Sequence, residues 1–136
     1  MSAKPETTFI SGVHKHFPPG RKNPYWMKNN NVYTAGVWDC WYSGPARDLW
    51  VEYKFAVIPK RDSTLMVPSL SALQLDWGAA RFAEGRNLAV IIGCKEGGVI
   101  FENLEWAEKI TAAAFKVRVQ SRKEIADWIM NRTGAL

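Results

Sequence analysis

The sequence contains only two cysteines, Cys40 and Cys94, and neither belongs to a CxxC motif. Isolated thiols of this kind are typical of small core residues in a reducing compartment. No run of about 18 apolar residues is present, which argues against a transmembrane helix. The first residues, 1–6, carry no apolar signal-peptide segment. These absences lead us to expect an intracellular, cytoplasmic protein.

Acidic residues are outnumbered by basic ones, with 13 Asp and Glu against 18 Lys and Arg, giving a formal net charge of +5. A basic chain favours a polyanionic partner such as nucleic acid, although many basic proteins bind none. No segment is repeated or of low complexity. With 136 residues and 47% hydrophobic content, the chain can build one core. We therefore expect a single domain over residues 1–136.

The first half of the chain predicts one helix followed by extended segments. Phe9, Val13 and Phe17 recur at four-residue spacing, which predicts a helix over about 6–16, ended by prolines 18 and 19. The following residues predict, in order, a basic aromatic loop, a short strand and two strand-like arms: 21–31, 32–34, 39–42 and 49–55. Ser43-Gly44-Pro45 supplies the turn between the two arms.

The second half predicts two further helices around a buried strand. One of these helices opens near Pro68, runs to Glu84 and stops at Gly85. The C-terminal helix begins at a capping box formed by Ser121 and Glu124. Residues 87–94 predict a buried central strand, Gly97-Gly98 a hairpin turn and 99–101 a strand. The segment 104–114 is ambiguous, with a helix favoured. Residues 115–119 predict a final edge strand, and 121–131 the C-terminal helix. The order αβββαβ, with additions, predicts an α/β or α+β domain on a mixed sheet.

The two arms carry the residues with the clearest chemical potential. Strand alternation places Glu52 and Lys54 on one face and directs Leu49, Val51, Tyr53 and Phe55 to the other. Asp39 supplies a second carboxylate on the neighbouring arm. One or two carboxylates are what Mg²⁺ typically takes from a protein, beside waters and phosphates. An acid-x-Lys pattern also arises by chance, so a solvated sheet face is the alternative interpretation.

Four segments, in order and spacing, resemble a known family. They are Gly36-Val37-Trp38-Asp39, the strand with Glu52-x-Lys54, the helix with Leu70-Ser71-x-x-Gln74, and the segment Gly85 to Gly93. Together with the helix that begins at Glu6, they resemble the PD-(D/E)xK nuclease superfamily, and within it the VRR-NUC family of virus-type replication-repair nucleases. The resemblance covers about residues 35–93. Trp38 stands where that family usually has proline, which alters the local backbone preference because proline fixes φ.

The resemblance implies a restriction-endonuclease-like fold and a metal-dependent DNA endonuclease. It implies that Asp39 and Glu52 ligate Mg²⁺ or Mn²⁺, that Lys54 assists the nucleophile, and that Glu6 and Gln74 lie near the site. For Glu6 the alternative is a carboxylate that complements the helix dipole, and for Gln74 it is a capping box with Ser71. Small family members resemble virus-encoded homodimers that act on branched DNA, including Holliday junctions, in the host cytoplasm.

Other residues are candidates for contacts with DNA. Tyr25, Trp26 and Lys28 could stack on bases and bind phosphates, and an ordinary packed loop is the alternative. His14 and Lys15 are candidate substrate contacts. His14 and His16, two positions apart, do not share a helix face, so they do not form a chelating pair. These residues and the net charge leave open a non-catalytic nucleic-acid-binding module, or an interaction protein with an idle site.

The tryptophan content gives a hint of self-association. The chain has seven tryptophans, and Trp41, Trp50, Trp106 and Trp128 are more large aromatic residues than one small core readily hides. Exposed apolar patches mark interfaces, and aromatic residues are enriched there. Symmetric cutting of a four-way junction also requires two active sites, most simply related by a two-fold axis. We therefore expect a homodimer, with a tryptophan-rich monomer as the alternative.

Overall fold

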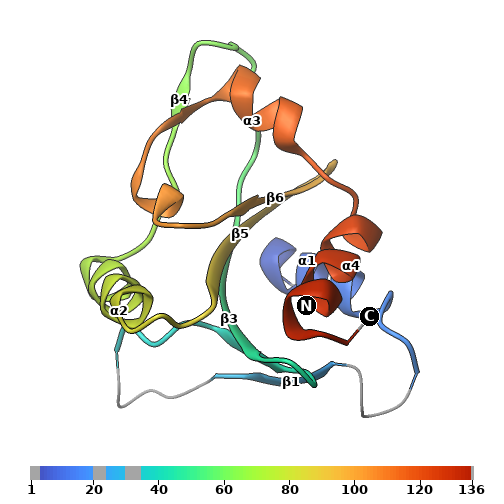
Figure 1. Ribbon diagram of the computed structural model, residues 1–136. Coiled ribbons are helices and arrows are strands. Elements are labelled where there is room, and N and C mark those ends of the chain that lie inside the picture. Colours follow the sequence, from blue (N-terminus) through green and yellow to red (C-terminus); the bar gives the residue numbers. More distant parts are fainter. Residues whose placement is uncertain (1–3, 20–23, 30–34, 136) are drawn as a thin grey trace.

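The computed structural model describes residues 4–19, 24–29 and 35–135. In this part of the chain, five strands form a mixed sheet in the order β1-β2-β3-β5-β6. Their bounds are β1 Tyr25–Lys28, β2 Cys40–Ser43, β3 Asp48–Phe55, β5 Leu88–Cys94 and β6 Gly97–Phe101. β3 and β5 run parallel, and the other neighbouring strands are antiparallel. The parallel pair needs a crossover, which contains α2, Ala72–Ala83 (Figure 1).

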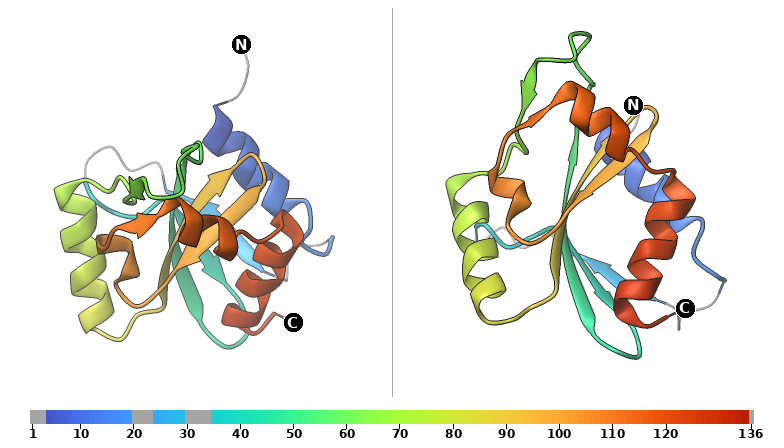
Figure 2. Two further views of the ribbon diagram at one scale, coloured as in Figure 1. Left: turned by 90° about the horizontal axis from the view of Figure 1, so that it is seen from above. Right: turned by 45° about the horizontal axis from the view of Figure 1, so that its top comes forward.

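Helices cover both faces of the sheet (Figures 1 and 2). α1, Pro5–His14, and α4, Arg122–Thr133, pack on one face, where Phe9, Val13 and Ile129 meet Val51 and Tyr53 of β3. α2 and the short elements η1, Glu105–Ala107, and α3, Ala112–Arg118, lie on the other, around the buried indoles of Trp38 and Trp106. Every residue of β5 is buried, which explains its uninterrupted apolar sequence.

Side-chain caps define where two of the helices begin. Ser71 caps α2 by accepting from the backbone N–H of Gln74, and the Gln74 side chain accepts in return from the backbone N–H of Ser71. Ser121 and Glu124 form the same capping box at α4. Gly134, at φ 77°, ends α4 in the left-handed conformation that glycine adopts without strain. In the described residues, no helix is long and apolar enough to cross a bilayer.

A small second sheet stands beyond the end of β3. It pairs β4, Leu65–Met66, with β7, Ile110–Thr111. The segment 104–114, for which a helix was favoured, instead contains η1, β7 and the start of α3. The prediction of an edge strand at 115–119 is wrong, because Phe115 to Arg118 belong to α3 and only Gln120 bridges the sheet, at Gly98. Thr111 caps this helix, and Phe115 anchors it in the core.

Two further predictions need correction. The turn between β5 and β6 is made by Lys95 and Glu96, and the two glycines lie inside β6. There they allow close packing, since a Cβ on Gly98 would meet the ring of Phe9. Residues 25–28, expected in a loop, form β1 at the edge of the sheet and pair with β2. The strand expected at 32–34 lies outside the described residues.

Candidate active site

β3 carries Glu52 and Lys54 on the face of the sheet that α2 covers. The antiparallel register pairs Cys40 with Val51, so Asp39, one residue before β2, lies opposite Glu52. The backbone N–H of Asp39 donates to Glu52 Oε1 at 3.1 Å. Tyr53, between the two polar residues, points to the opposite face and is fully buried there. The alternation expected from the sequence therefore brings the two acidic residues and the lysine together.

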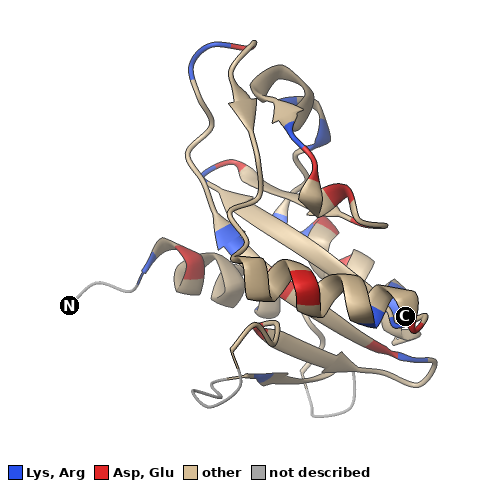
Figure 3. Ribbon diagram, turned by 90° about the vertical axis from the view of Figure 1, so that its left-hand side faces the viewer, with Lys and Arg blue, Asp and Glu red and all other residues tan. Residues whose placement is uncertain are grey.

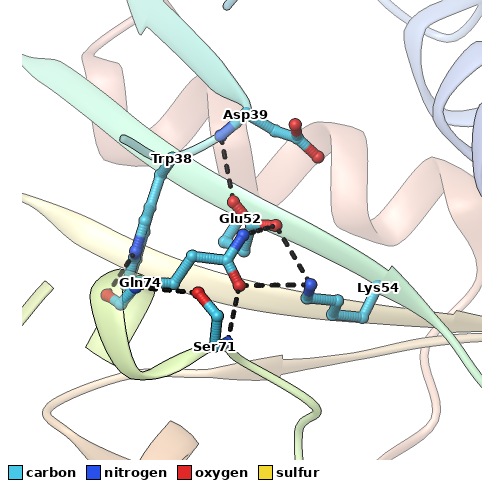
Figure 4. A network of polar contacts seen from close by, with 6 residues as sticks. All are labelled: Trp38, Asp39, Glu52, Lys54, Ser71 and Gln74. Carbon is cyan, nitrogen blue, oxygen red and sulfur yellow. Dashed lines mark hydrogen bonds and ion pairs between the residues drawn. The ribbon is translucent and has the colours of Figure 1, made fainter. Parts of the chain in front are cut away.

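Gln74, in the first turn of α2, joins these residues into one network (Figure 4). Its side-chain Nε2 donates to Glu52 Oε2 at 3.1 Å, and its Oε1 accepts from Lys54 Nζ at 3.3 Å. The same Oε1 accepts from the backbone N–H of Ser71 at 2.9 Å. Lys54 Nζ also lies 3.5 Å from Glu52 Oε2. Gln74 thus completes the capping box of α2 and also contacts Glu52 and Lys54, while its functional role stays a prediction.

Trp38, which replaces the proline of the resembled family, ties the Asp39 segment to α2. Its indole is fully buried, and Nε1 donates to the backbone carbonyl of Gln74 at 3.0 Å. The connections form a closed ring: Trp38 binds Gln74, Gln74 binds Glu52, and Glu52 accepts from Asp39, the next residue in the chain. The sequence motifs did not assign this role. The sequence feature that pointed to this role is a large aromatic residue directly before Asp39.

The carboxylates are held where their charge is costly. Glu52 is 3% exposed, and burial, reinforced by the nearby charge of Asp39, raises its pKa to about 7. Burial also raises the pKa of Asp39, while Lys28 and Lys54 oppose that shift. The pKa of Glu6, on α1, is raised by burial and then by Asp39. Glu6 therefore lies close enough to interact electrostatically with Asp39, and three acidic residues share one region.

The donor set fits a hard divalent cation. Glu52 and Asp39 offer carboxylate oxygens, and a cation would offset the burial that raises the pKa of both and the charge of Asp39 that raises the pKa of Glu52 further. In the described residues, no group of three or more His, Cys, Asp or Glu side chains is arranged to hold a metal by itself. Two carboxylates with waters and substrate phosphate are sufficient for Mg²⁺. Asp39 and Glu52 are therefore the residues that would hold it.

The candidate DNA contacts fall into two groups. Lys28, on β1, lies near the acidic residues, because its charge lowers the pKa of both Glu6 and Asp39. Tyr25 and Trp26, also on β1, are 52% and 44% exposed. Lys15, just after α1, is exposed. These side chains are accessible, as a contact with DNA requires.

His14 is held in an aromatic cluster instead. Its ring lies 4.1 Å from the ring of Trp26, centroid to centroid, and stacks on Phe17. Its Nε2 makes a 2.7 Å hydrogen bond with the Tyr42 hydroxyl. Burial, with the charge of Lys28, lowers the pKa of His14 to about 4. The structure places this ring beneath Trp26 and does not join it to the network of Glu52 and Gln74.

The tryptophans mostly find partners within the chain. Trp106 is buried against Trp38, with ring centroids 5.1 Å apart, so it belongs to the core. Trp50 packs on Trp77 at 5.3 Å. Trp41 meets Tyr25 at 5.8 Å, and Trp128 lies under the guanidinium of Arg132. The large exposed apolar residues of the sheet edge are instead those of β1.

Comparison with known proteins shows likeness in fold. No protein-family model and no curated protein matches the sequence. Among solved structures, the 1.6 Å structure of Archaeoglobus fulgidus Hjc, a Holliday junction resolvase from an archaeal hyperthermophile, is similar, with a TM-score of 0.54. The match covers 91% of this chain and 97% of that chain at 15% sequence identity. The mixed sheet flanked by helices thus has the α/β fold of that structure, and a mixed α/β domain is what the sequence predicts.

Proposed function

We propose that this chain is a Mg²⁺- or Mn²⁺-dependent endodeoxyribonuclease that hydrolyses phosphodiester bonds, with preference for branched DNA such as Holliday junctions. One observation carries the proposal: the carboxylate of Glu52 is hydrogen-bonded between Asp39 and Gln74, with the Lys54 ammonium beside it. A buried carboxylate next to a partly exposed ammonium is an arrangement that a structural sheet face does not require.

Each residue of the network has a distinct role. Asp39 and Glu52 would hold the cation, which when bound would supply Lewis-acid activation of water and offset charge on the phosphate. Lys54, 23% exposed at its side chain, presents its ammonium to the nucleophile and to the charge that develops on the phosphate. Gln74 orients both Glu52 and Lys54 through one amide group. Glu6, with its raised pKa, is suited to accept a proton from water.

The basic and aromatic residues around the site provide the DNA surface. Lys28 offsets the acidic charge next to the site and would meet a phosphate there. Tyr25 and Trp26 expose rings on which an unpaired base could stack, with His14 supporting the ring of Trp26. Lys15 would add a phosphate contact. The likeness in fold to a Holliday junction resolvase supports branched DNA as the substrate. A four-way junction needs two symmetric cuts, which favours a homodimer with two active sites.

A cleavage panel tests the activity. Purified protein is incubated with linear, flapped and four-way DNA in Mg²⁺, in Mn²⁺ and in chelator, and we expect cutting only with metal and mainly of the four-way substrate. Asp39→Asn and Lys54→Met should each lower the rate by a factor of about 100 or more, as lost charge-stabilising groups do. Asp76→Asn and Lys95→Met change the same residue types at exposed positions and serve as controls. Full activity in the Asp39 or Lys54 variant would show that the assignment is wrong.

A non-catalytic nucleic-acid-binding module is the second candidate. The exposed rings of β1 beside Lys28 favour it, because stacking and phosphate contacts do not need a metal. Such a module would bind DNA with strong salt dependence and show no cleavage under any metal. The same panel, read alongside a binding titration, separates the two functions.

A further inference from the structure

β3 continues beyond the site into a projecting segment, residues 59–64, which we call the finger. It follows Phe55, the last residue of β3, and precedes β4 (Figure 1, green, top). The backbone N–H of Ala56 donates to the carbonyl of Gly93, so the chain leaves the sheet from a fixed point. Figures 2 and 3 show the finger standing out from the body of the molecule, beyond the end of β3.

The finger is anchored along its length. The carbonyls of Asp62 and Thr64 accept from the backbone N–H groups of Ala113 and Ala112, at 3.1 and 2.8 Å. These donors belong to the first turn of α3, where helical N–H groups lack partners in their own helix. The Asp62 carboxylate accepts from Lys116 Nζ at 2.8 Å. The finger is therefore held by α3 through both its backbone and its single acidic side chain.

Two basic side chains of the finger have no acidic partner among the described residues. Lys60 and Arg61 are exposed, and within the described residues neither side chain has a hydrogen bond or an ion pair. Asp62, the neighbouring acid, is already matched by Lys116. Lys60 lines a shallow hollow with Pro59, Glu96 and Lys116, but it forms no ion pair with Glu96 among the described residues. The finger presents two positive charges to solvent at a defined place.

That place is within reach of DNA bound at the site. Lys60 follows Lys54 by six residues, which span at most about 20 Å even when fully extended. One strand of duplex advances 3.4 Å per nucleotide, so the finger lies within roughly six base pairs of Lys54. The charges of Lys28 and Lys4 lower the pKa of Glu6, so both lie near that carboxylate. Basic groups thus stand around the site as well as on the finger.

We infer that the finger is a DNA-binding element: Lys60 and Arg61 bind backbone phosphates of the duplex that flanks the scissile bond. The inference rests on the proposed function for the position of the DNA, but not for its binding. Phosphate contacts of this kind carry no sequence information and fix the register of the duplex on the protein. Because α3 already holds the backbone of the finger, less conformational entropy is lost when Lys60 and Arg61 bind DNA.

The salt dependence of binding tests the finger directly. Wild-type protein in chelator, which prevents metal-dependent cutting, is titrated with a fluorescent 30-base-pair duplex at several salt concentrations. A plot of log affinity against log salt has a negative slope. For Lys60→Ala/Arg61→Ala, we expect this slope to become shallower by about 1.8, or 0.9 for each lost phosphate contact. The same slope gives an affinity loss of about eightfold per contact at 0.1 M salt. Thermal melting should be unchanged, and Lys60→Gln/Arg61→Gln provides a second variant.

A matched control removes two positive charges from the other end of β3. Arg47 and Arg86 line a hollow there beside Trp50, and Arg47→Ala/Arg86→Ala changes the net charge equally. We expect this control to keep most of the wild-type slope. An unchanged slope in the finger variant, or an equal fall in the control, would overturn the inference, as would no binding of DNA at all. Binding with the expected loss but no cleavage in metal would support the finger and reject the nuclease.

Discussion

Gly78, on α2, lies directly against the indole of Trp38. A Cβ on residue 78 would come closer than 3.0 Å to Cζ2 of that ring, a distance that real Cβ atoms essentially never show. The ring in turn donates its N–H to the Gln74 carbonyl, one helical turn before Gly78. The glycine therefore sets how near α2 approaches the chain segment that carries Asp39. The position of the hydrogen-bonded network of Asp39, Glu52, Lys54 and Gln74 depends on this contact.

Gly78→Ala should destabilise the protein although alanine is the better helix former. The helix propensity favours alanine by about 1 kcal/mol, whereas overpacking a tight core costs about 1–3 kcal/mol and displaces α2. Trp38→Phe removes the donor and part of the ring, and it should also lower stability and cleavage. The double variant should lose less than the sum of the two, because the smaller ring makes room for the methyl group. Denaturant unfolding of all four proteins measures this coupling, and strict additivity would contradict the contact.

Ser71→Ala and Gln74→Ala separate capping from catalysis. Each breaks the capping box of α2, and each should cost about 1 kcal/mol of unfolding free energy. Only Gln74→Ala also removes the hydrogen bonds to Glu52 and Lys54. We expect Ser71→Ala to keep most of the cleavage rate and Gln74→Ala to lose at least tenfold. Equal loss of rate in both would mean that Gln74 acts only through the helix.

Glu52 makes stability fall as pH rises. Its pKa is about 7 in the fold against an ordinary value of 4.5, so the folded state binds more protons between those values. Stability contributed by the protonated form is therefore lost as pH rises from 4.5 to 7, by about 3 kcal/mol in total. His14 works the other way, because its pKa falls to about 4 from 6.5 and stability is lost as pH drops through that window.

Comparison of the wild type with Glu52→Gln isolates the first effect. The glutamine variant keeps a neutral group in the buried site, and it should become relatively more stable up to pH 7 and stay so above it. Mg²⁺ should raise the melting temperature of the wild type at pH 8 more than at pH 5, where Glu52 is protonated, and should leave the variant nearly unchanged. If the stabilities of the wild type and the variant change in parallel from pH 4.5 to 8, the pKa of Glu52 is not raised.

A homodimer should depend on β1, which lies at the edge of the main sheet in the described residues. Met27 is 48% exposed on this strand, and exposed apolar edges promote association. Light scattering at micromolar concentration should give twice the 15.4 kDa mass of one chain. Met27→Lys should reduce that value, while Leu65→Lys, at a 58% exposed position on β4, should not. A single-chain mass for the wild type at all concentrations would exclude the two-site mechanism.

The sequence predicts well those parts of the fold that depend on residues close together in the chain. Ser71 with Gln74 and Ser121 with Glu124 predict helix starts because the capping partners are three residues apart in sequence. The apolar run that becomes β5 predicts a strand covered on both faces. Glu52 and Lys54 share a face simply because a strand alternates.

Other parts depend on contacts distant in sequence. Residues 115–119 alternate like a strand, but α3 is too short for helical periodicity to show, and Val117 is left 86% exposed. β1 is identified as a strand only by its pairing with β2, a contact that the sequence of residues 25–28 does not reveal. Likewise, the role of Trp38 depends on Gly78, which lies forty residues later and matters only once α2 has packed.

The parallel pairing of β3 with β5 has a consequence for the order in which the protein matures. Asp39, Glu52, Lys54 and Gln74 have all been synthesised by residue 74, yet β3 gains its inner neighbour only when residues 88–94 follow. α2, as the crossover, packs in place only when those two strands meet. A growing chain that ends before β5 therefore carries every residue of the site without the geometry that joins them. Activity should emerge on the ribosome late and abruptly, with the fold.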